Sequence, residues 1–472
     1  MINLAAAFAL RRDTAEPLFV QLCDLVRKRI ANLEPGQDRR LPPTRALAAE
    51  LGISRSTVVT AYEQLVAEGY IEGRRGSGYY VRELAETGRA IGRAAAPRRF
   101  ETPSAADSNA FAHPGYPDDR LFPYRRWARC LARSARLEPE AQIVSRSRFG
   151  DPALRASIAR YLADWRGLDV APERIMITAG SVDALETCIR SLAVQGQVIG
   201  LENPCYQPLR NIADIQGMRI RWLPIDAGGA RLPEVSSPVP DMVVLTPSQQ
   251  FPLGGAMAAA RRLDYLQWAR DNDAWIVEDD YDSEFRYAGR PIPALTSLDP
   301  AGRSIYIGTF SKVFSVSLRL GYLIMPEPLV ERFAQTLARF GVKAALPCQR
   351  ALANFIDDGD FYRHIRRVRR IYADRRRVLV DGIQRRLARY VDFEDHQAGM
   401  QITVGLAPGY DDLEIAARAR VRGVPVTPLS IYYAGDDRRQ GLLLGFCPYT
   451  EEEIGARVDT LADILATSTP AV

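Results

Sequence analysis

The sequence predicts an α/β protein with two folded parts of different kinds. Residues 1–82 show three helical patterns and then a short hairpin, which is the element order of a winged helix-turn-helix. Beyond residue 110, short apolar runs alternate with amphipathic segments, as expected for an α/β domain with a largely parallel sheet. Residues 83–110 are rich in Ala, Arg and Pro and lack periodicity, so we expect a linker between the two parts.

Capping residues set the limits of the elements in the first part. Thr44 is the expected N-cap of the second helix and Gly52 its stop, while Ser54 is the expected N-cap of the third helix. The hairpin carries basic residues at its tip. The predicted helices are 17–33, 45–51 and 55–68, and the predicted strands are 70–71 and 79–81.

Six apolar runs are the strand candidates of the second part. They are 175–177, 198–201, 242–245, 275–277, 304–307 and 321–324. We expect a domain over residues 111–472, with a large subdomain at about 150–335 and a small subdomain formed from both flanks.

Composition narrows the class of protein. A chain of 472 residues is too long for one core, and 47% apolar residues is ordinary for a globular protein. No run of roughly 18 apolar residues occurs, and the N-terminus lacks the order of a signal peptide, so we expect a cytoplasmic protein with no membrane partner. Six scattered cysteines show no paired spacing, and the three histidines form no metal-ligand pattern, so no metal is expected.

The positive charge is concentrated near the N-terminus. Residues 1–100 carry 16 Lys or Arg and 11 Asp or Glu, whereas the remainder carries 46 of each. The formal net charge of +5 therefore belongs to the first part, where a module that binds phosphate groups would need it.

Lysine is rare in this arginine-rich chain, with Lys28, Lys312 and Lys343 as the only three. A lysine amine forms an imine with an aldehyde cofactor such as pyridoxal phosphate, whereas a guanidinium stays protonated and cannot. Lys28 lies in the first helix, and Lys343 has no phosphate-binding group nearby in the sequence. Lys312 follows Thr309 and Ser311 and precedes Arg319, and these groups could hold the cofactor's phosphate.

The segment Leu41 to Gly69, with Leu-Pro-Pro-Thr-Arg and Ile-Ser-Arg-Ser-Thr-Val, resembles the DNA-binding module of the GntR family of bacterial regulators. Arg55 opens the expected recognition helix, where a guanidinium can bind guanine O6 and N7. A single exposed arginine indicates only a solvated surface, but the ordered set favours double-stranded DNA as a partner. The resemblance implies DNA contacts by Arg45, Ser54, Arg55, Ser56, Thr57, Arg74, Arg75 and Gly76.

The second part resembles the fold-type I pyridoxal-phosphate-dependent aminotransferases. The carrying segments are Thr178 to Leu185, Glu202 to Tyr206, Trp275 to Phe285 and Gly308 to Lys312. The resemblance implies that Asp279, chosen over Asp280 on this ground alone, pairs with the cofactor's ring nitrogen. It also implies a ring stacked on Tyr206, a hydrogen bond from Tyr281, and a Schiff base with Lys312. The phosphate is expected at Gly180, Ser181, Thr309, Ser311 and Arg319.

Together the two parts resemble the MocR/GabR/PdxR subfamily, in which a GntR-type winged helix is joined to an aminotransferase-like domain. This resemblance implies a homodimer that binds DNA. The leading hypothesis is a transcription regulator that senses pyridoxal phosphate, or a small amine or amino acid, through an imine at Lys312 and controls vitamin B6 or amino-compound metabolism. Two alternatives are an active aminotransferase with an accessory DNA-binding module, and a DNA-binding protein with an inert scaffold domain.

Three departures from the aminotransferase pattern lower the expectation of efficient turnover. Leu443 stands where an arginine usually binds the substrate carboxylate, Val182-Asp183 replaces two glutamines, and Phe149 lacks a tyrosine hydroxyl. An acidic effector could instead use Arg210, Arg438 or Arg439. The arginine-rich segment 362–389 is interpreted as a solvated face, with DNA contact as the alternative.

Overall fold

The structure is a computed structural model of the whole chain, and it describes residues 10, 16–33, 38–74, 76–82, 114–144, 147–234, 238–289 and 292–468. The chain divides into two compact units, Met1–Ser104 and Ala105–Val472, which are described separately. The predicted linker 83–110 lies outside the described residues. Among the described helices, none combines the length and apolar character required to cross a membrane.

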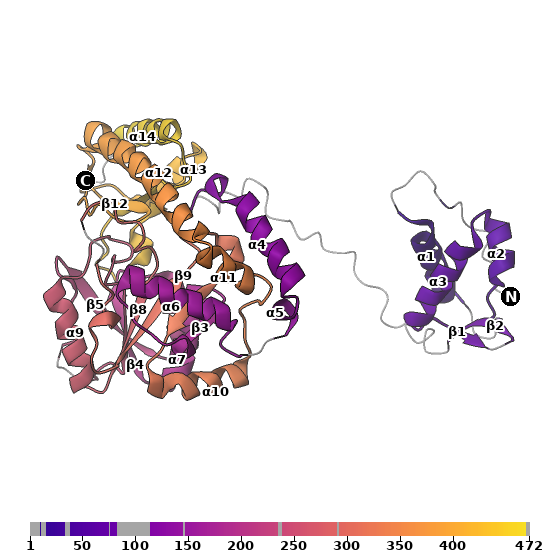
Figure 1. The fold of residues 1–472 in the computed structure, drawn as a ribbon. Helices are drawn as coiled ribbons and strands as arrows, with labels where there is room; N and C mark the ends of the chain where they lie inside the picture. The colour runs from indigo at the N-terminus through magenta and orange to yellow at the C-terminus, as the bar shows by residue number, and fades with distance from the viewer. Residues whose placement is uncertain are drawn as a thin grey trace. The chain divides into compact units, whose positions relative to one another are not determined.

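The N-terminal unit contains three helices and a hairpin (Figure 1), in the order predicted for a winged helix-turn-helix. Its core is built mainly from α1 and α3 side chains, including the fully buried Leu22 and Tyr62. The hairpin is antiparallel, with Ile71 opposite Val81. The elements are α1 (Leu18–Ala31), α2 (Thr44–Leu51), α3 (Arg55–Ala67), β1 (Ile71–Arg74) and β2 (Gly78–Val81).

Two of the three predicted caps in this unit are confirmed. Ser54 accepts a hydrogen bond from the Thr57 amide, and Gly52 ends α2 in the left-handed conformation with φ of 62°. The prediction for Thr44 is wrong. Pro43 takes the N-cap position and Thr44 is the first helical residue, because the proline's extended backbone already starts the turn.

The C-terminal unit is built on a mixed sheet of eight strands in the order β3-β10-β9-β8-β7-β4-β5-β6. The five strands from β9 to β5 are parallel, while β10 and β6 pair antiparallel with their neighbours. All six predicted strands are present; β5 was missed because its residues are mostly half-buried and do not form a continuous apolar run. The strands are β3 (Ile175–Thr178), β4 (Val198–Asn203), β5 (Arg219–Asp226), β6 (Gly229–Ala230), β7 (Met242–Leu245), β8 (Trp275–Asp280), β9 (Ser304–Thr309) and β10 (Gly321–Ile324).

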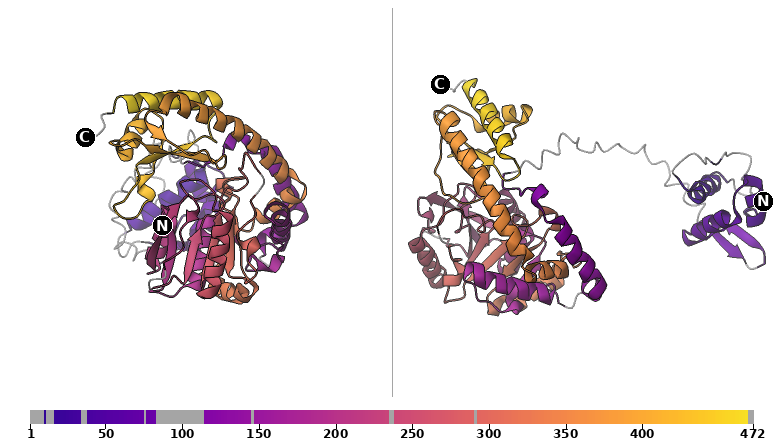
Figure 2. Two further views of the ribbon diagram at one scale, coloured as in Figure 1. Left: turned by 90° about the vertical axis from the view of Figure 1, so that its left-hand side faces the viewer. Right: turned by 45° about the horizontal axis from the view of Figure 1, so that its top comes forward.

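Helices cover this sheet, and separate apolar clusters line its two faces (Figures 1 and 2). Helix α7 follows β3 and packs against β9 and β10, while α6 packs against α11. The helices are α4 (Tyr124–Leu137), α5 (Glu140–Ile143), α6 (Pro152–Arg166), α7 (Ser181–Leu192), α8 (Gln207–Ile215), α9 (Ala259–Asp271), α10 (Val330–Phe340) and α11 (Gln349–Asp357).

A smaller subdomain follows, with an antiparallel sheet of four strands in the order β11-β12-β14-β13. Figure 2 shows the long helix α12 running from the large sheet to this smaller one. Its elements are α12 (Asp360–Gly382), β11 (Val391–Asp392), β12 (Gln401–Leu406), α13 (Asp412–Val421), β13 (Thr427–Pro428), β14 (Gly441–Gly445) and α14 (Glu451–Ala466).

Helix α12 corrects part of the prediction for the arginine-rich segment. Arg363, Arg370 and other arginines are exposed, as expected of a solvated face, but Arg375 and Arg376 are buried. Arg375 forms an ion pair with the buried Asp118 at 2.9 Å. A guanidinium is buried only with a partner, so this pair fastens the segment after residue 114 to the helix.

Candidate functional site

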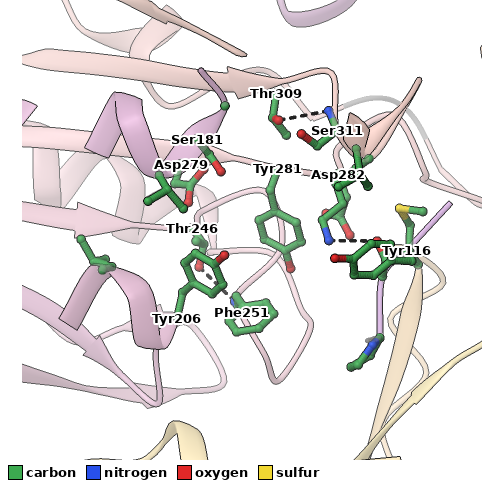
Figure 3. A pocket seen from close by; sticks show the side chains of 18 of the residues that line it. Tyr116, Ser181, Tyr206, Thr246, Phe251, Asp279, Tyr281, Asp282, Thr309 and Ser311 are labelled. Atoms are coloured by element: carbon green, nitrogen blue, oxygen red, sulfur yellow. Dashed lines mark hydrogen bonds between the residues drawn. The ribbon is translucent and has the colours of Figure 1, made fainter. Parts of the chain in front are cut away.

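One cavity of about 230 Å³ in the C-terminal unit contains all nine residues that the sequence suggested for a cofactor. It lies between the ends of the parallel strands and the smaller subdomain, with side chains from both (Figure 3). This is the usual place for a ligand in an α/β fold, because parallel strands end at the same edge of the sheet. The nine residues are Gly180, Ser181, Tyr206, Asp279, Tyr281, Thr309, Ser311, Lys312 and Arg319.

The amine of Lys312 lies inside this cavity, three residues after β9 ends at Thr309. Its Nζ atom donates a hydrogen bond to the carbonyl oxygen of Gly115 at 2.9 Å and lies 5.5 Å from the centre of the Tyr116 ring. Burial lowers the pKa of the Lys312 amine, while the carboxylate of Asp282 opposes that shift. The lowered pKa favours the neutral amine, which is the nucleophilic form.

Asp279 and Asp280 end strand β8 and differ in their surroundings. Asp280 forms an ion pair with Arg166 at 2.8 Å and accepts hydrogen bonds from Tyr306 and Ser283. The Oδ1 atom of each is buried without a hydrogen-bond partner, but Asp279 lines the cavity and Asp280 is not among its described lining residues. Burial, together with the charges of Asp280 and Glu202, raises the pKa of Asp279 to about 7. The geometry therefore favours Asp279 over Asp280 as the carboxylate available to a ligand.

Aromatic side chains form one wall of the cavity (Figure 3). Phe251 lies edge-on to Tyr206 and Tyr281, with ring centres 5.6 and 5.8 Å apart. Burial raises the pKa of Tyr206, and the Asp279 carboxylate adds to the shift, so the phenol stays protonated at neutral pH. A flat heteroaromatic ring between Tyr206 and Asp279 would gain stacking on one side and a carboxylate at its nitrogen.

The opposite end of the cavity carries groups suited to a phosphate. Helix α7 begins at Ser181, so its N-terminal amides and positive dipole end face the cavity. Gly180 has φ of 91° and open space where a Cβ would lie, so the backbone can approach an anion closely. Thr309, Ser311 and the exposed Arg319 add two hydroxyls and a guanidinium.

Two of the sequence departures have structural explanations. Asp183 accepts a hydrogen bond from the Ala179 amide at 2.8 Å and lies 3.3 Å from Lys343, so it stabilises the turn before α7. Phe149 is buried in the apolar cluster that contains Met176, so within this unit its ring serves the core.

The described residues among those proposed to contact DNA lie at or near the surface of the N-terminal unit. Arg45 and Arg55 are exposed, and Ser56 lies beside the capping hydroxyl of Ser54 at 2.7 Å. Thr57 is half-buried and is also hydrogen-bonded to Ser54 at 2.8 Å. These hydroxyls therefore stabilise the start of α3 as well as presenting polar groups there.

The hairpin tip is partly held in place. Arg74 donates a hydrogen bond to Glu72 at 2.8 Å, and its guanidinium lies over the Tyr80 ring. Gly76 is exposed with φ of 73°, whereas Arg75 lies outside the described residues.

Several further cavity residues were missed by the sequence reasoning. Glu202 and Asp282 stand in segments that carried the resemblance but were given no role there. Gly115, Tyr116 and Gln401 carry no distinctive motif, and folding brings them to the cavity from distant parts of the chain. Among the missed residues are Gly115, Tyr116, Glu202, Asp282 and Gln401.

Fold and cavity together define an aminotransferase-type domain joined to a winged helix-turn-helix. Residues 117–454 match the family model of aminotransferase class I and II, and residues 19–81 match that of bacterial regulatory proteins of the gntR family. The chain belongs to the MocR/GabR/PdxR subfamily of GntR transcription regulators.

Similar regulators align with nearly the whole chain. The probable rhizopine catabolism regulatory protein MocR of Rhizobium meliloti is 40% identical over 451 residues, covering 93% of this chain and 91% of that protein. The HTH-type pyridoxine biosynthesis transcriptional regulator PdxR of Corynebacterium glutamicum is 34% identical over 469 residues, covering 96% of this chain and 95% of that protein.

Solved aminotransferases share the fold of the C-terminal unit. An archaeal alanine:glyoxylate aminotransferase aligns with a TM-score of 0.72 and 26% identity, covering 77% of this chain and 94% of that one. The kynurenine aminotransferase of Pyrococcus horikoshii, solved in complex with PMP, aligns with a TM-score of 0.69 and 26% identity, covering 75% of this chain and 89% of that one.

The residues of the cavity fit a pyridoxal-phosphate-type cofactor. The partnerless Oδ1 atom of Asp279 suits a protonated ring nitrogen, and Gly180 leaves room for a phosphate at the start of α7. Lys312 supplies an amine in the same cavity. The donor set therefore agrees with the chemistry of this cofactor class.

Proposed function

We propose that this protein is a pyridoxal-phosphate-dependent transcription regulator that acts in the cytoplasm as a homodimer. Pyridoxal phosphate itself, or a small amine or amino acid entering the same cavity, is the signal. The genes it controls would serve vitamin B6 or amino-compound metabolism, in line with the printed names of the similar PdxR and MocR proteins.

One observation supports the proposal most strongly. The amine of Lys312, the partnerless carboxylate of Asp279 and the α7 N-terminus at Ser181 surround one cavity in a chain that also carries a winged helix-turn-helix. A DNA-binding module needs none of these groups for its own work. Their presence in the chain favours a regulator whose DNA binding responds to a small molecule.

The residues divide the work of binding. Asp279 would hold the ring nitrogen, Tyr206 would stack on the ring, and Tyr281 would donate to its phenolic oxygen. Thr309, Ser311 and Arg319 would hold the phosphate with the amides of Gly180 and Ser181. The bound cofactor supplies an aldehyde that condenses with a primary amine, here that of Lys312.

Two contacts connect this cavity to the rest of the C-terminal unit. Lys312 contacts Gly115, and Asp118 three residues later is paired with Arg375 of α12. A change at the Lys312 amine therefore acts on the segment from Gly115 to Asp118, which contains some of the first described residues of the C-terminal unit. Such a change is the physical basis we propose for coupling the cavity to DNA binding.

The decisive experiment is a spectral titration of the purified protein with pyridoxal phosphate, followed by DNA binding with and without the cofactor. We expect a new visible absorbance band and a changed DNA affinity. A band with no change in DNA affinity would contradict sensing. Sustained multiple turnover of an amino donor with a keto acid would favour the alternative of an active aminotransferase.

A further inference from the structure

The position where aminotransferases place a carboxylate-binding arginine is occupied by an apolar cluster. Leu443 lies in β14 opposite Thr403 of β12 and is 1% exposed. It packs with Leu429 and Tyr432, and this cluster supports Phe251 in the cavity wall. The Phe251 and Tyr432 rings are 5.1 Å apart and perpendicular. A ligand carboxylate at this wall would lose its water without gaining a charged partner.

The charged groups of the cavity also disfavour a ligand carboxylate. Among the described residues that line it, the basic ones are Lys312 and Arg319, and the acidic ones are Glu202, Asp279 and Asp282. Lys312 and Arg319 are needed for the cofactor's aldehyde and phosphate. Arg210, Arg438 and Arg439, the alternatives suggested by the sequence, are not among the described lining residues.

The carboxyl groups around the cavity already oppose each other's ionisation. Burial raises the pKa of Glu202 and of Glu284 to about 7, and the charge of Asp280 adds to the shift at Glu284. Burial and the same neighbour raise the pKa of Asp282 well above its ordinary value. A further anion would add to this repulsion, whereas a cation would relieve it and a neutral group would leave it unchanged.

Asp282 and Gln401 are placed to meet the substituents of an amine near Lys312. Asp282 is the acid with the largest electrostatic effect on the Lys312 amine. A Cβ atom built on Gly115 would lie 3.3 Å from the Lys312 Nζ atom and 3.5 Å from the Gln401 Oε1 atom, so both side chains reach the same glycine at the cavity wall. A carboxyl group and a neutral amide suit hydroxyl or ammonium groups on a ligand.

We infer that this cavity selects primary amines that carry hydroxyl or further amino groups in place of a carboxylate, with Asp282 and Gln401 as the residues that determine this specificity. The inference rests on the proposed function, in which a small molecule enters the cofactor cavity. Where the proposed function allows an amine or an amino acid as the ligand, this inference selects amines without a carboxylate.

Matched pairs of amines test the inference on the cofactor-loaded full-length protein. The pairs are 2-aminoethanol with glycine, and 1,4-diaminobutane with 4-aminobutyrate. In the first pair a hydroxymethyl group replaces the carboxylate of the amino acid, and in the second an aminomethyl group replaces it. Affinity is measured by calorimetry and by the change in visible absorbance. We expect the carboxylate-free member of each pair to bind at least about tenfold more tightly, since a buried unpaired charge costs more than 1.4 kcal/mol. Equal or tighter binding of the amino acid overturns the inference.

Two variants assign the preference to residues. Asp282→Asn keeps the side-chain size and replaces a carboxyl group that can ionise or accept two hydrogen bonds by a neutral amide, so it should reduce the preference within each pair by about tenfold. Leu443→Arg introduces the missing cation and should raise the affinity for 4-aminobutyrate; if this variant does not fold, Asp282→Asn decides. An unchanged preference in Asp282→Asn overturns the role of Asp282.

The outcomes also separate this inference from the proposed function. A protein that shows no visible band with pyridoxal phosphate lacks the proposed cofactor, and both proposals then fail. A protein that shows the band but binds neither member of either pair overturns the amine specificity alone, with the cofactor itself left as the signal.

Discussion

The Lys312 Nζ atom donates a hydrogen bond to the carbonyl oxygen of Gly115, 2.9 Å away and 197 residues earlier in the chain. Gly115 has φ of 81°, a conformation that a residue with a Cβ rarely adopts. A Cβ there would also lie 3.3 Å from the amine. A reaction that removes the N–H bonds of the Lys312 amine therefore breaks its hydrogen bond to the Gly115 carbonyl oxygen.

Gly115→Ala should weaken cofactor binding by about tenfold. The added methyl group crowds the amine that must react, and a loss of about 1.4 kcal/mol in binding is tenfold in affinity. The left-handed backbone separately costs a non-glycine residue roughly 1–2 kcal/mol of stability. The measurement is the dissociation constant of pyridoxal phosphate from its visible absorbance. Gly423→Ala is the matched control, because φ there is 74° and nothing lies within 4 Å of its Cβ position. It should lose similar stability and keep its cofactor affinity.

Lys312→Ala should abolish the visible band while DNA affinity without the cofactor stays unchanged. The reason is that Lys312 is the described lysine that lines the cavity. Lys343→Ala is the matched control, since Lys343 is exposed and paired with Glu186 at 2.5 Å. This control should keep the band. A Lys312→Ala protein that still forms the band would assign the imine to another amine.

The sequence predicted the elements well where local signals are strong. The six apolar runs became strands, and Ser54 caps α3, because burial and capping follow from neighbouring residues. Gly115 and Gln401 could not be placed, because their approach to Lys312 depends on how distant segments pack. The burial of Arg375 was missed for the same reason, since its partner Asp118 lies far away in sequence.

Asp279→Asn should stabilise the cofactor-free protein and weaken its binding of the cofactor. Burial raises the pKa of Asp279 from 3.8 to about 7. The folded state therefore holds a proton that the unfolded state releases between these values, and stability falls as pH rises through that range. Above pH 7 the buried charge costs up to about 4 kcal/mol, and asparagine avoids this cost.

The measurement for Asp279→Asn is the unfolding midpoint of cofactor-free protein at pH 5 and pH 8. The advantage of the variant over the unchanged protein should be clearly smaller at pH 5 than at pH 8. Asp392→Asn is the control, because Asp392 is exposed and paired with Arg439 at the surface. A pH-independent difference would mean that Asp279 is ionised in the folded state across this range.

Arg55→Ala should cost roughly 1–3 kcal/mol of binding to specific DNA and much less to unrelated DNA. Arg55 is exposed at the start of α3, where a recognition helix presents its first side chains to base edges. A specific site is first selected from random duplexes with the unchanged protein, and both proteins are then titrated on this site and on a scrambled one. Arg29→Ala, an exposed arginine of α1, is the control and should leave both affinities nearly unchanged. Equal losses on the two duplexes would assign Arg55 to the phosphate backbone, because a phosphate contact weakens binding to every sequence alike and lowers the salt dependence.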